Sequence, residues 1–343
     1  MKPAAISRSS AAAVVAVVAV VAVVALVLLA LGSGARAQSF SPSTAPASSF
    51  PSKVIRIIVP WPAGGTTDIV GRLIGQKLGE ALQQPVIIDN RPGQSGSVGT
   101  EALVRAPADG YTLLVSSMGT HTMNQFFYKL DFDPVEDVAP VSMLVSVPAA
   151  LVAHPSAPFS DVKGFIAAAK ARPGKLNVAS GSSAYQLFLE QMKVTAGINV
   201  EHVRYRGAGP AMTDLIGGQV EMLITGMPAI TPQAKAGKLK VIAVTNARRA
   251  LAMPDVPTFS ETFPGLDFDN WTALFARAGT PKPIVDRLNA EIVRILAQPD
   301  VRERLATLGA EPAPSTPQEL ATVIRKDAER WGRIIKASGM QPD

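Results

Sequence analysis

The segment 60–68, Pro-Trp-Pro-Ala-Gly-Gly-Thr-Thr-Asp, carries the residues best suited to chemistry in this chain. An apolar run precedes it, and helical spacing follows from Thr66 or Thr67. The start of a helix leaves backbone N–H groups unpaired and partially positive, and glycine lets a ligand come close to the backbone. The segment therefore predicts either an anion site built from N–H groups, for a carboxylate or phosphate, or only a tight turn between strand and helix.

Signatures of catalysis and of cofactor binding are absent from the sequence. There is no cysteine, which excludes disulfides, thiolate metal sites and a cysteine nucleophile. The three histidines, at 121, 154 and 202, are far apart, and no nucleophile-elbow, zinc-protease or phosphate-loop motif occurs. The glycines at 93, 96 and 99 are interpreted as a turn. We therefore expect no enzyme activity, no cofactor and no metal.

The elements around this segment alternate between strand and helix. Apolar runs at 54–59, 86–88 and 111–115 predict strands, and the spacing over 67–82 predicts a helix, so a mainly parallel sheet is expected. A long β-like run from 139, broken by Pro148, predicts a strand that passes from one lobe to another. A second series follows, with helices at 161–171, 184–196 and 210–216 and strands at 176–179, 200–205, 221–225 and 239–245. Two further helices are predicted near Pro283 and after Thr316, where Thr316 and Glu319 match a capping box.

The N-terminal segment 1–37 has the features of a secretory signal peptide. Positive residues precede an apolar stretch at 11–31, and Ala-Arg-Ala at 35–37 is a cleavage pattern. The stretch is also long enough to remain as a membrane anchor. Residues 38–52 are rich in Ser and Pro, which predicts a flexible leader. Loss of 1–37 removes three basic residues and no acidic one, so the formal net charge falls from +6 to about +3, and no nucleic-acid partner is expected.

Seven stretches of the chain together resemble one protein family. They are 50–68, 90–100, 109–114, 119–121, 214–220, 253–258 and 279–291. From about residue 51 onward the chain is similar to the Bug or TctC-type extracytoplasmic solute receptors of tripartite tricarboxylate transporters. The resemblance implies an α/β fold of the type II periplasmic binding protein (Venus flytrap) class, with lobe 1 at 53–147 and 250–343 and lobe 2 at 148–249. It implies a periplasmic, monomeric receptor that captures a small organic carboxylate by hinge closure and passes it to transporter membrane subunits.

The resemblance also implies which residues bind the ligand. These are Trp61, Ala63, Gly64, Gly65, Thr66, Asp68, Ser116, Thr120, His121, Ser180, Gly181, Ser182, Ser183, Gln186 and Tyr205. The loop at 177–186 is about two residues shorter than usual, with Gln186 where a histidine is common. The acidic residue that often follows the strand ending at Thr225 is missing, which favours a plain carboxylate over an amino acid. An exported enzyme acting on a carboxylate or phosphate ester, and a membrane-anchored sensor, are the alternative interpretations.

Overall fold

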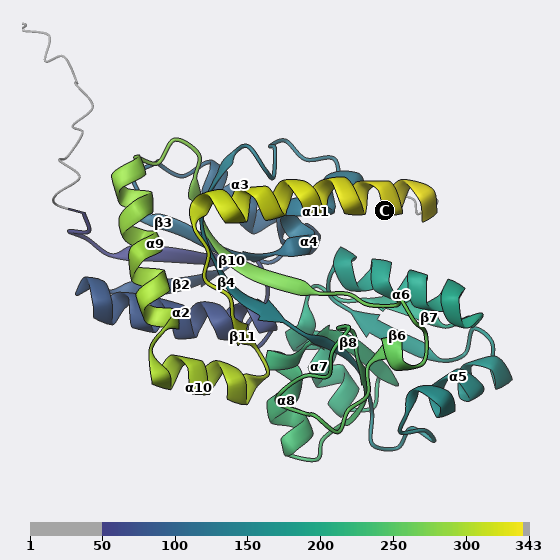
Figure 1. Cartoon of the computed structure of the whole chain (residues 1–343). Helices are drawn as coiled ribbons and strands as arrows, with labels where there is room; N and C mark the ends of the chain where they lie inside the picture. Colours follow the sequence, from purple (N-terminus) through teal and green to yellow (C-terminus); the bar gives the residue numbers. More distant parts are fainter. Residues whose placement is uncertain (1–49, 339–343) are drawn as a thin grey trace, which may run out of the picture. The chain divides into compact units, whose positions relative to one another are not determined.

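A computed structural model describes residues 50–338, which form two α/β lobes (Figure 1). The predicted signal peptide or anchor, and the leader up to residue 49, lie outside the described residues. Within the described part of the chain, no helix combines the length and the apolar character that crossing a membrane requires.

The first lobe is built on a six-stranded sheet in the order β11-β4-β10-β3-β1-β2. Its strands are β1 (Ile55–Val59), β2 (Val86–Asn90), β3 (Thr112–Ser117), β4 (Val138–Val147), β10 (Asn270–Arg277) and β11 (Glu311–Pro312). Strand β1 pairs in parallel with β2 and β3, as predicted, whereas β10 is antiparallel to both β3 and β4. Because β10 runs against its neighbours, its first residues lie beside the last residues of β3.

Helices cover both faces of this sheet. They are α2 (Thr66–Leu82), α3 (Ser97–Val104), α4 (Met118–Thr122), α9 (Lys282–Leu296), α10 (Pro299–Leu308) and α11 (Pro317–Ser338). Helices α2, α9 and α10 share one apolar cluster with Ile57 and Leu113, whereas α3, α4 and α11 share another with Ile58 and Leu114. Neighbouring residues of a strand face opposite sides of the sheet, so each side has its own core.

The second lobe is built on a five-stranded sheet in the order β7-β6-β8-β5-β9. Its strands are β5 (Ala149–Ala153), β6 (Asn177–Ser180), β7 (Glu201–Arg204), β8 (Met222–Gly226) and β9 (Lys240–Val244). Its helices are α5 (Val162–Ala171), α6 (Ser183–Ala196), α7 (Ala208–Ile216) and α8 (Met227–Lys235). Helices α5 and α6 pack in one core cluster, and α7 and α8 pack in another.

Two connections join the lobes. Strand β4 ends at Val147 and β5 begins at Ala149, so the predicted break at Pro148 is confirmed and marks the first crossing. The second crossing runs from β9 back to β10. The predicted capping box is also confirmed, because Glu319 N–H donates to Thr316 Oγ1 and Thr316 N–H donates to the Glu319 carboxylate.

One expectation about local structure needs correction, and several elements were missed. The glycines at 93, 96 and 99 do not form only a turn, because the short 3₁₀ helix η2 (Gln94–Gly96) leads directly into α3. Gly93 and Gly96 have positive φ, and Gly99 packs so closely on Pro60 that an added Cβ would lie 2.6 Å from its Cβ. Helices α4, α8 and α10 and strands β10 and β11 were not predicted from the sequence.

Candidate functional site

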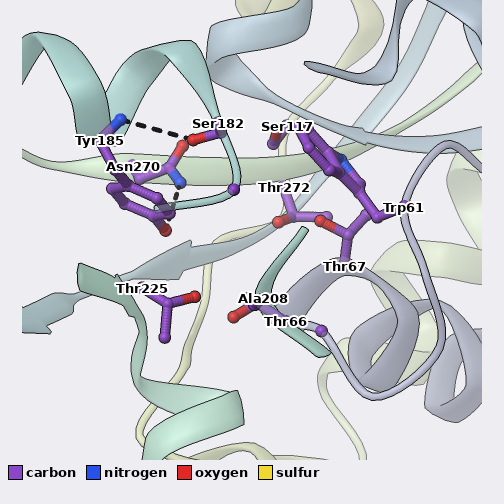
Figure 2. Close-up of a pocket in the computed structure, with 12 residues that line it drawn as sticks. Trp61, Thr66, Thr67, Ser117, Ser182, Tyr185, Ala208, Thr225, Asn270 and Thr272 are labelled. Carbon is purple, nitrogen blue, oxygen red and sulfur yellow. Dashed lines mark hydrogen bonds between the residues drawn. The ribbon is translucent and has the colours of Figure 1, made fainter. Parts of the chain in front are cut away.

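A small cavity of about 40 Å³ lies where the two lobes meet (Figure 2). The first lobe contributes Trp61, Gly65, Thr66, Thr67, Ser117, Asn270 and Thr272, and the second contributes Gly181, Ser182, Tyr185, Ala208 and Thr225. Most of these residues are at, or close to, the end of a strand or the beginning of a helix, whereas Asn270 and Thr272 are at the beginning of β10. None of the described residues that line the cavity is charged.

The loop after β1 forms the first-lobe wall and is held from behind. Asp68 accepts hydrogen bonds from the Gly64 N–H at 3.0 Å and from Asn90 Nδ2 at 2.9 Å, and it forms an ion pair with Arg72 at 2.9 Å. Asn90 Nδ2 also donates to the Trp61 carbonyl oxygen at 2.9 Å. Burial by itself raises the pKa of Asp68, but the hydrogen bonds from Arg72, Asn90 and Gly64 outweigh it and keep the pKa below its ordinary value. The Asp68 carboxylate, charged at neutral pH, therefore fixes the loop.

Two helices begin at the cavity wall without a side-chain cap. Helix α2 follows Gly65, and α7 follows Gly207; neither has a side chain that accepts from its first N–H groups. The first N–H groups of a helix have no partner inside the helix, and the dipole makes this end partially positive. Thr66 and Ala208, the first residues of the two helices, both line the cavity. Such an arrangement can hold an anion without a basic side chain.

The second-lobe wall depends on glycines because backbones approach closely there. A Cβ added to Gly181 would lie 2.4 Å from Gly207 Cα, and one added to Gly207 would lie 2.5 Å from Pro62 Cδ in the first lobe. A Cβ on Gly209 would lie 2.4 Å from the Ala63 carbonyl oxygen, also across the lobes. These positions accept no larger residue while the lobes are in contact.

Direct hydrogen bonds also join the lobes around the cavity. Ser183 Oγ donates to Asn124 Oδ1 at 2.7 Å, and Thr66 Oγ1 donates to the Gly226 carbonyl oxygen at 3.3 Å. On the far side from Trp61, Asn270 Nδ2 donates to the Tyr185 hydroxyl oxygen at 3.1 Å. The structure therefore shows the lobes in contact on several sides of the cavity.

Five of the residues expected to bind a ligand line the cavity: Trp61, Gly65, Thr66, Gly181 and Ser182. The first-lobe residues outside its lining are Ala63, Gly64, Asp68, Ser116, Thr120 and His121. Ser116 is fully buried within β3, and Thr120 donates to the Ser95 carbonyl oxygen. His121 is stacked on Phe275 with its Nδ1 2.7 Å from the Pro134 carbonyl oxygen, and burial lowers its pKa to about 4.

The second-lobe residues outside the cavity lining are Ser180, Ser183, Gln186 and Tyr205. Gln186 Oε1 accepts from Arg204 at 2.8 Å, and the Tyr205 hydroxyl donates to Asp214 at 2.6 Å. A separate hollow of about 360 Å³ is lined by Arg204, Tyr205 and the exposed Arg206 of the second lobe and by Gly93, Gln94, Ser95 and Tyr128 of the first. Arg206 lies two residues before Ala208, so this hollow places positive charge close to the cavity.

Sequence reasoning missed seven lining residues: Thr67, Ser117, Tyr185, Ala208, Thr225, Asn270 and Thr272. One available signal was strand direction, because ligands of α/β proteins bind at the carboxyl ends of parallel strands. That rule selects Ser117 at the end of β3 and Thr225 in the penultimate position of β8. The antiparallel β10 brings its first residues to the same place, since Thr272 pairs with Ser117.

Comparison with known proteins gives a consistent assignment. A family model described as the tripartite tricarboxylate transporter family receptor (TctC) matches residues 70–340. Protein BugT of Bordetella pertussis is 36% identical over 303 residues, which cover 85% of this chain and 91% of BugT.

Solved structures of similar proteins agree. The structure of R. palustris Rpa4515 with adipate has 33% identity and a TM-score of 0.83, and the match covers 86% of this chain and 100% of that one. MatC (Rpa3494) from Rhodopseudomonas palustris with bound malate has 34% identity and a TM-score of 0.78, over 83% of this chain and 100% of that one. The chain therefore belongs to the tripartite tricarboxylate transporter receptor family, as the sequence motifs predicted, and its two lobes have the type II periplasmic binding protein fold.

Proposed function

We propose that this chain is a periplasmic receptor that binds a small organic carboxylate between its lobes and presents it to transporter membrane subunits. Family membership supports this role, and two similar proteins have been solved with adipate and with malate. In this proposal the receptor acts as a monomer, and the ligand is released chemically unchanged.

The observation that carries the proposal is the chemistry of the cavity wall. Two uncapped helix starts meet at a cavity whose described lining residues are all uncharged. The indole Nε1 of Trp61 is buried and has no hydrogen-bond partner among the described residues, which adds a further donor. An anion can accept hydrogen bonds from these groups, whereas no carboxylate lines the cavity to pair with an ammonium group. The wall therefore favours a carboxylate without an amine.

We propose that the five predicted residues in the cavity wall contact the ligand, and that Asp68 and Gly64 shape the loop that carries Gly65 and Thr66. The lining residues also support binding without turnover. They include no histidine, lysine or acidic residue for proton transfer, and burial raises the pKa of Tyr185 to about 12, so this hydroxyl remains protonated.

A thermal-shift screen of purified residues 38–343 tests the proposal. The panel contains succinate, malate, adipate and citrate, with inorganic phosphate, glutamate and the methyl ester of each carboxylate as comparisons. A ligand at 100 times its Kd stabilises the folded state by about 2.7 kcal/mol, which raises the melting temperature by several degrees. We expect a rise with at least one carboxylate and none with its ester. A folded protein that responds to none of the carboxylates would contradict the proposal.

Turnover is tested separately. We expect that NMR spectra of the stabilising carboxylate, recorded after overnight incubation with stoichiometric receptor, show only the starting compound. Conversion of the ligand into a product would instead favour an enzyme that uses the same cavity.

A further inference from the structure

Tyr185 occupies a fixed place in the second-lobe wall. It lies in the first turn of α6, is 7% exposed, and lines the cavity. Its ring packs edge-on against Phe268 with 6.1 Å between ring centroids, in a core that spans both lobes. In Figure 2 the hydroxyl groups of Tyr185 and Thr225 lie on the opposite side of the cavity from Trp61 and Thr67. Packing of the ring thus sets the position of the hydroxyl oxygen.

A chain of hydrogen bonds sets the direction of the Tyr185 proton. The Trp271 N–H donates to Asn270 Oδ1 at 2.9 Å, so the oxygen of this amide is already used and its Nδ2 must point the other way. Asn270 Nδ2 donates to the Tyr185 hydroxyl oxygen at 3.1 Å. Because the hydroxyl accepts from Asn270, its single proton is left for another acceptor. Within residues 50–338 no acceptor is recorded for it.

We propose that Tyr185 is a specificity-determining residue that donates a hydrogen bond to a second acceptor oxygen on the ligand, and that Asn270 is the positioning residue that directs this donor into the cavity. The first carboxylate would lie at the uncapped start of α2. The ligand class is therefore a carboxylate with a carboxylate or carbonyl oxygen at its distal end.

The position of the pair explains why it would discriminate among ligands. A ligand that ends in a methyl group would leave a buried hydroxyl without an acceptor, and one that ends in an ammonium group would present a donor to a donor. Asn270 lies on β10 of the first lobe and Tyr185 on α6 of the second, so the donor is oriented only while the lobes are in contact. Recognition of the distal group and contact between the lobes are thus linked.

This inference rests on the proposed function, and matched ligand pairs test it separately. The pairs are succinate with butyrate and adipate with hexanoate, which differ only in the distal group, measured by isothermal titration calorimetry. We expect the wild type to bind at least one dicarboxylate about tenfold or more tighter than its partner, as is typical for a hydrogen bond to a charged acceptor. In Tyr185→Phe that ratio should fall to about one, mainly through weaker binding of the dicarboxylate.

Two further variants distinguish a loss of the oriented Tyr185 donor from a nonspecific effect of substitution. Tyr111→Phe is the matched control, since its hydroxyl accepts from the Ser52 N–H and does not line the cavity, and its ratio should equal that of the wild type. Asn270→Asp keeps an acceptor for Trp271 N–H but replaces the donor to Tyr185 by a second acceptor, which turns the tyrosine proton away from the ligand. It should remove any preference for 4-oxopentanoate over pentanoate, a pair that differs by an uncharged acceptor.

The possible outcomes distinguish the two proposals. Carboxylate binding with an unchanged ratio in a folded Tyr185→Phe protein would overturn this inference alone, as would equal wild-type affinity within both dicarboxylate pairs. Failure of every carboxylate to bind the wild type would overturn the proposed function and this inference with it.

Discussion

Replacement of Gly209 by alanine should weaken ligand binding while it preserves or raises the stability of the protein. Gly209 is the second residue of α7, and its added Cβ would lie 2.4 Å from the Ala63 carbonyl oxygen in the opposite lobe. Ordinary contact begins at 3.4 Å, so the two groups must separate by roughly 1 Å. Ala63 lies between residues tied down by Asn90 and Asp68, which leaves movement of the lobes as the main means of relief.

The two effects have opposite signs. Overpacking of this kind costs about 1–3 kcal/mol, and here it acts only while the lobes touch, so the Kd should rise by about 5- to 150-fold. Alanine in a helix is favoured over glycine by about 0.5–1 kcal/mol, so the melting temperature without ligand should stay the same or rise slightly.

The assay combines calorimetry, using the carboxylate with the largest thermal shift, with small-angle X-ray scattering. Gly217→Ala is the matched control, because Gly217 caps the end of the same helix with φ of −78° and its Cβ would meet only carbonyl oxygens of that helix, Thr213 at 3.4 Å and Asp214 at 3.8 Å. We expect Gly209→Ala to enlarge the radius of gyration and to raise the Kd, and Gly217→Ala to change neither. An unchanged Kd in Gly209→Ala, or a lower melting temperature with weakened binding, would refute this account of the interlobe contact.

Three further predictions concern charge. Asp68→Ala should lower the free energy of unfolding by about 1–3 kcal/mol, because the Gly64 and Asn90 donors lose their acceptor. It should also weaken ligand binding, although residue 68 does not line the cavity. Wild-type stability in thermal melts and wild-type affinity in calorimetry would contradict this. Burial lowers the pKa of His121 to about 4, so between pH 6.5 and pH 4 the unfolded chain binds a proton at this residue and the folded chain does not. The free energy of unfolding should therefore fall by about 1.4 kcal/mol for each pH unit down to pH 4. Urea titrations should show a smaller slope in His121→Gln. Arg206→Gln should slow ligand association several-fold at low salt and have little effect near 1 M salt. Stopped-flow tryptophan fluorescence measures the association rate. An equal slowing at both salt concentrations would exclude electrostatic steering by Arg206.

Much of the fold can be predicted from the sequence because the spacing of the apolar residues and the turn-forming residues indicate the same elements. The alternation of apolar runs with helical spacing predicts most strands and helices to within two residues, and Pro148 marks the first crossing. Helix α10 is different: it follows α9 after only two residues, so its start has no loop of its own to signal it. Helix α3 is hidden by the three glycines, of which Gly99 is needed for contact with Pro60.

The candidate site is harder to predict because one residue of register decides which side chain faces the cavity. Ser116 was chosen from the sequence, yet β3 extends to Ser117, and alternation along the strand directs the two side chains to opposite faces. In α6 the same problem arises with a helical period. Successive residues are rotated by about 100°, so Tyr185 lines the cavity while Gln186 reaches Arg204. Sequence motifs identify the loop, whereas the facing residue depends on where the element begins.

The cavity can bind an anion without charged side chains because strands of both sheets end close to it and lead into helices. Strands β1 and β7 are followed by the helices α2 and α7, whose partially positive starts lie at the cavity. An anion can thus be held by backbone groups, which leaves the lining side chains free to distinguish one anion from another. Strand β10 is the exception, since its opposite direction brings the side chains of Asn270 and Thr272, rather than a helix start, to the cavity. If selectivity resides there, substitutions at Tyr185 and Asn270 should change which carboxylate binds, whereas substitutions at Gly65 or Thr66 should weaken all carboxylates to a similar degree.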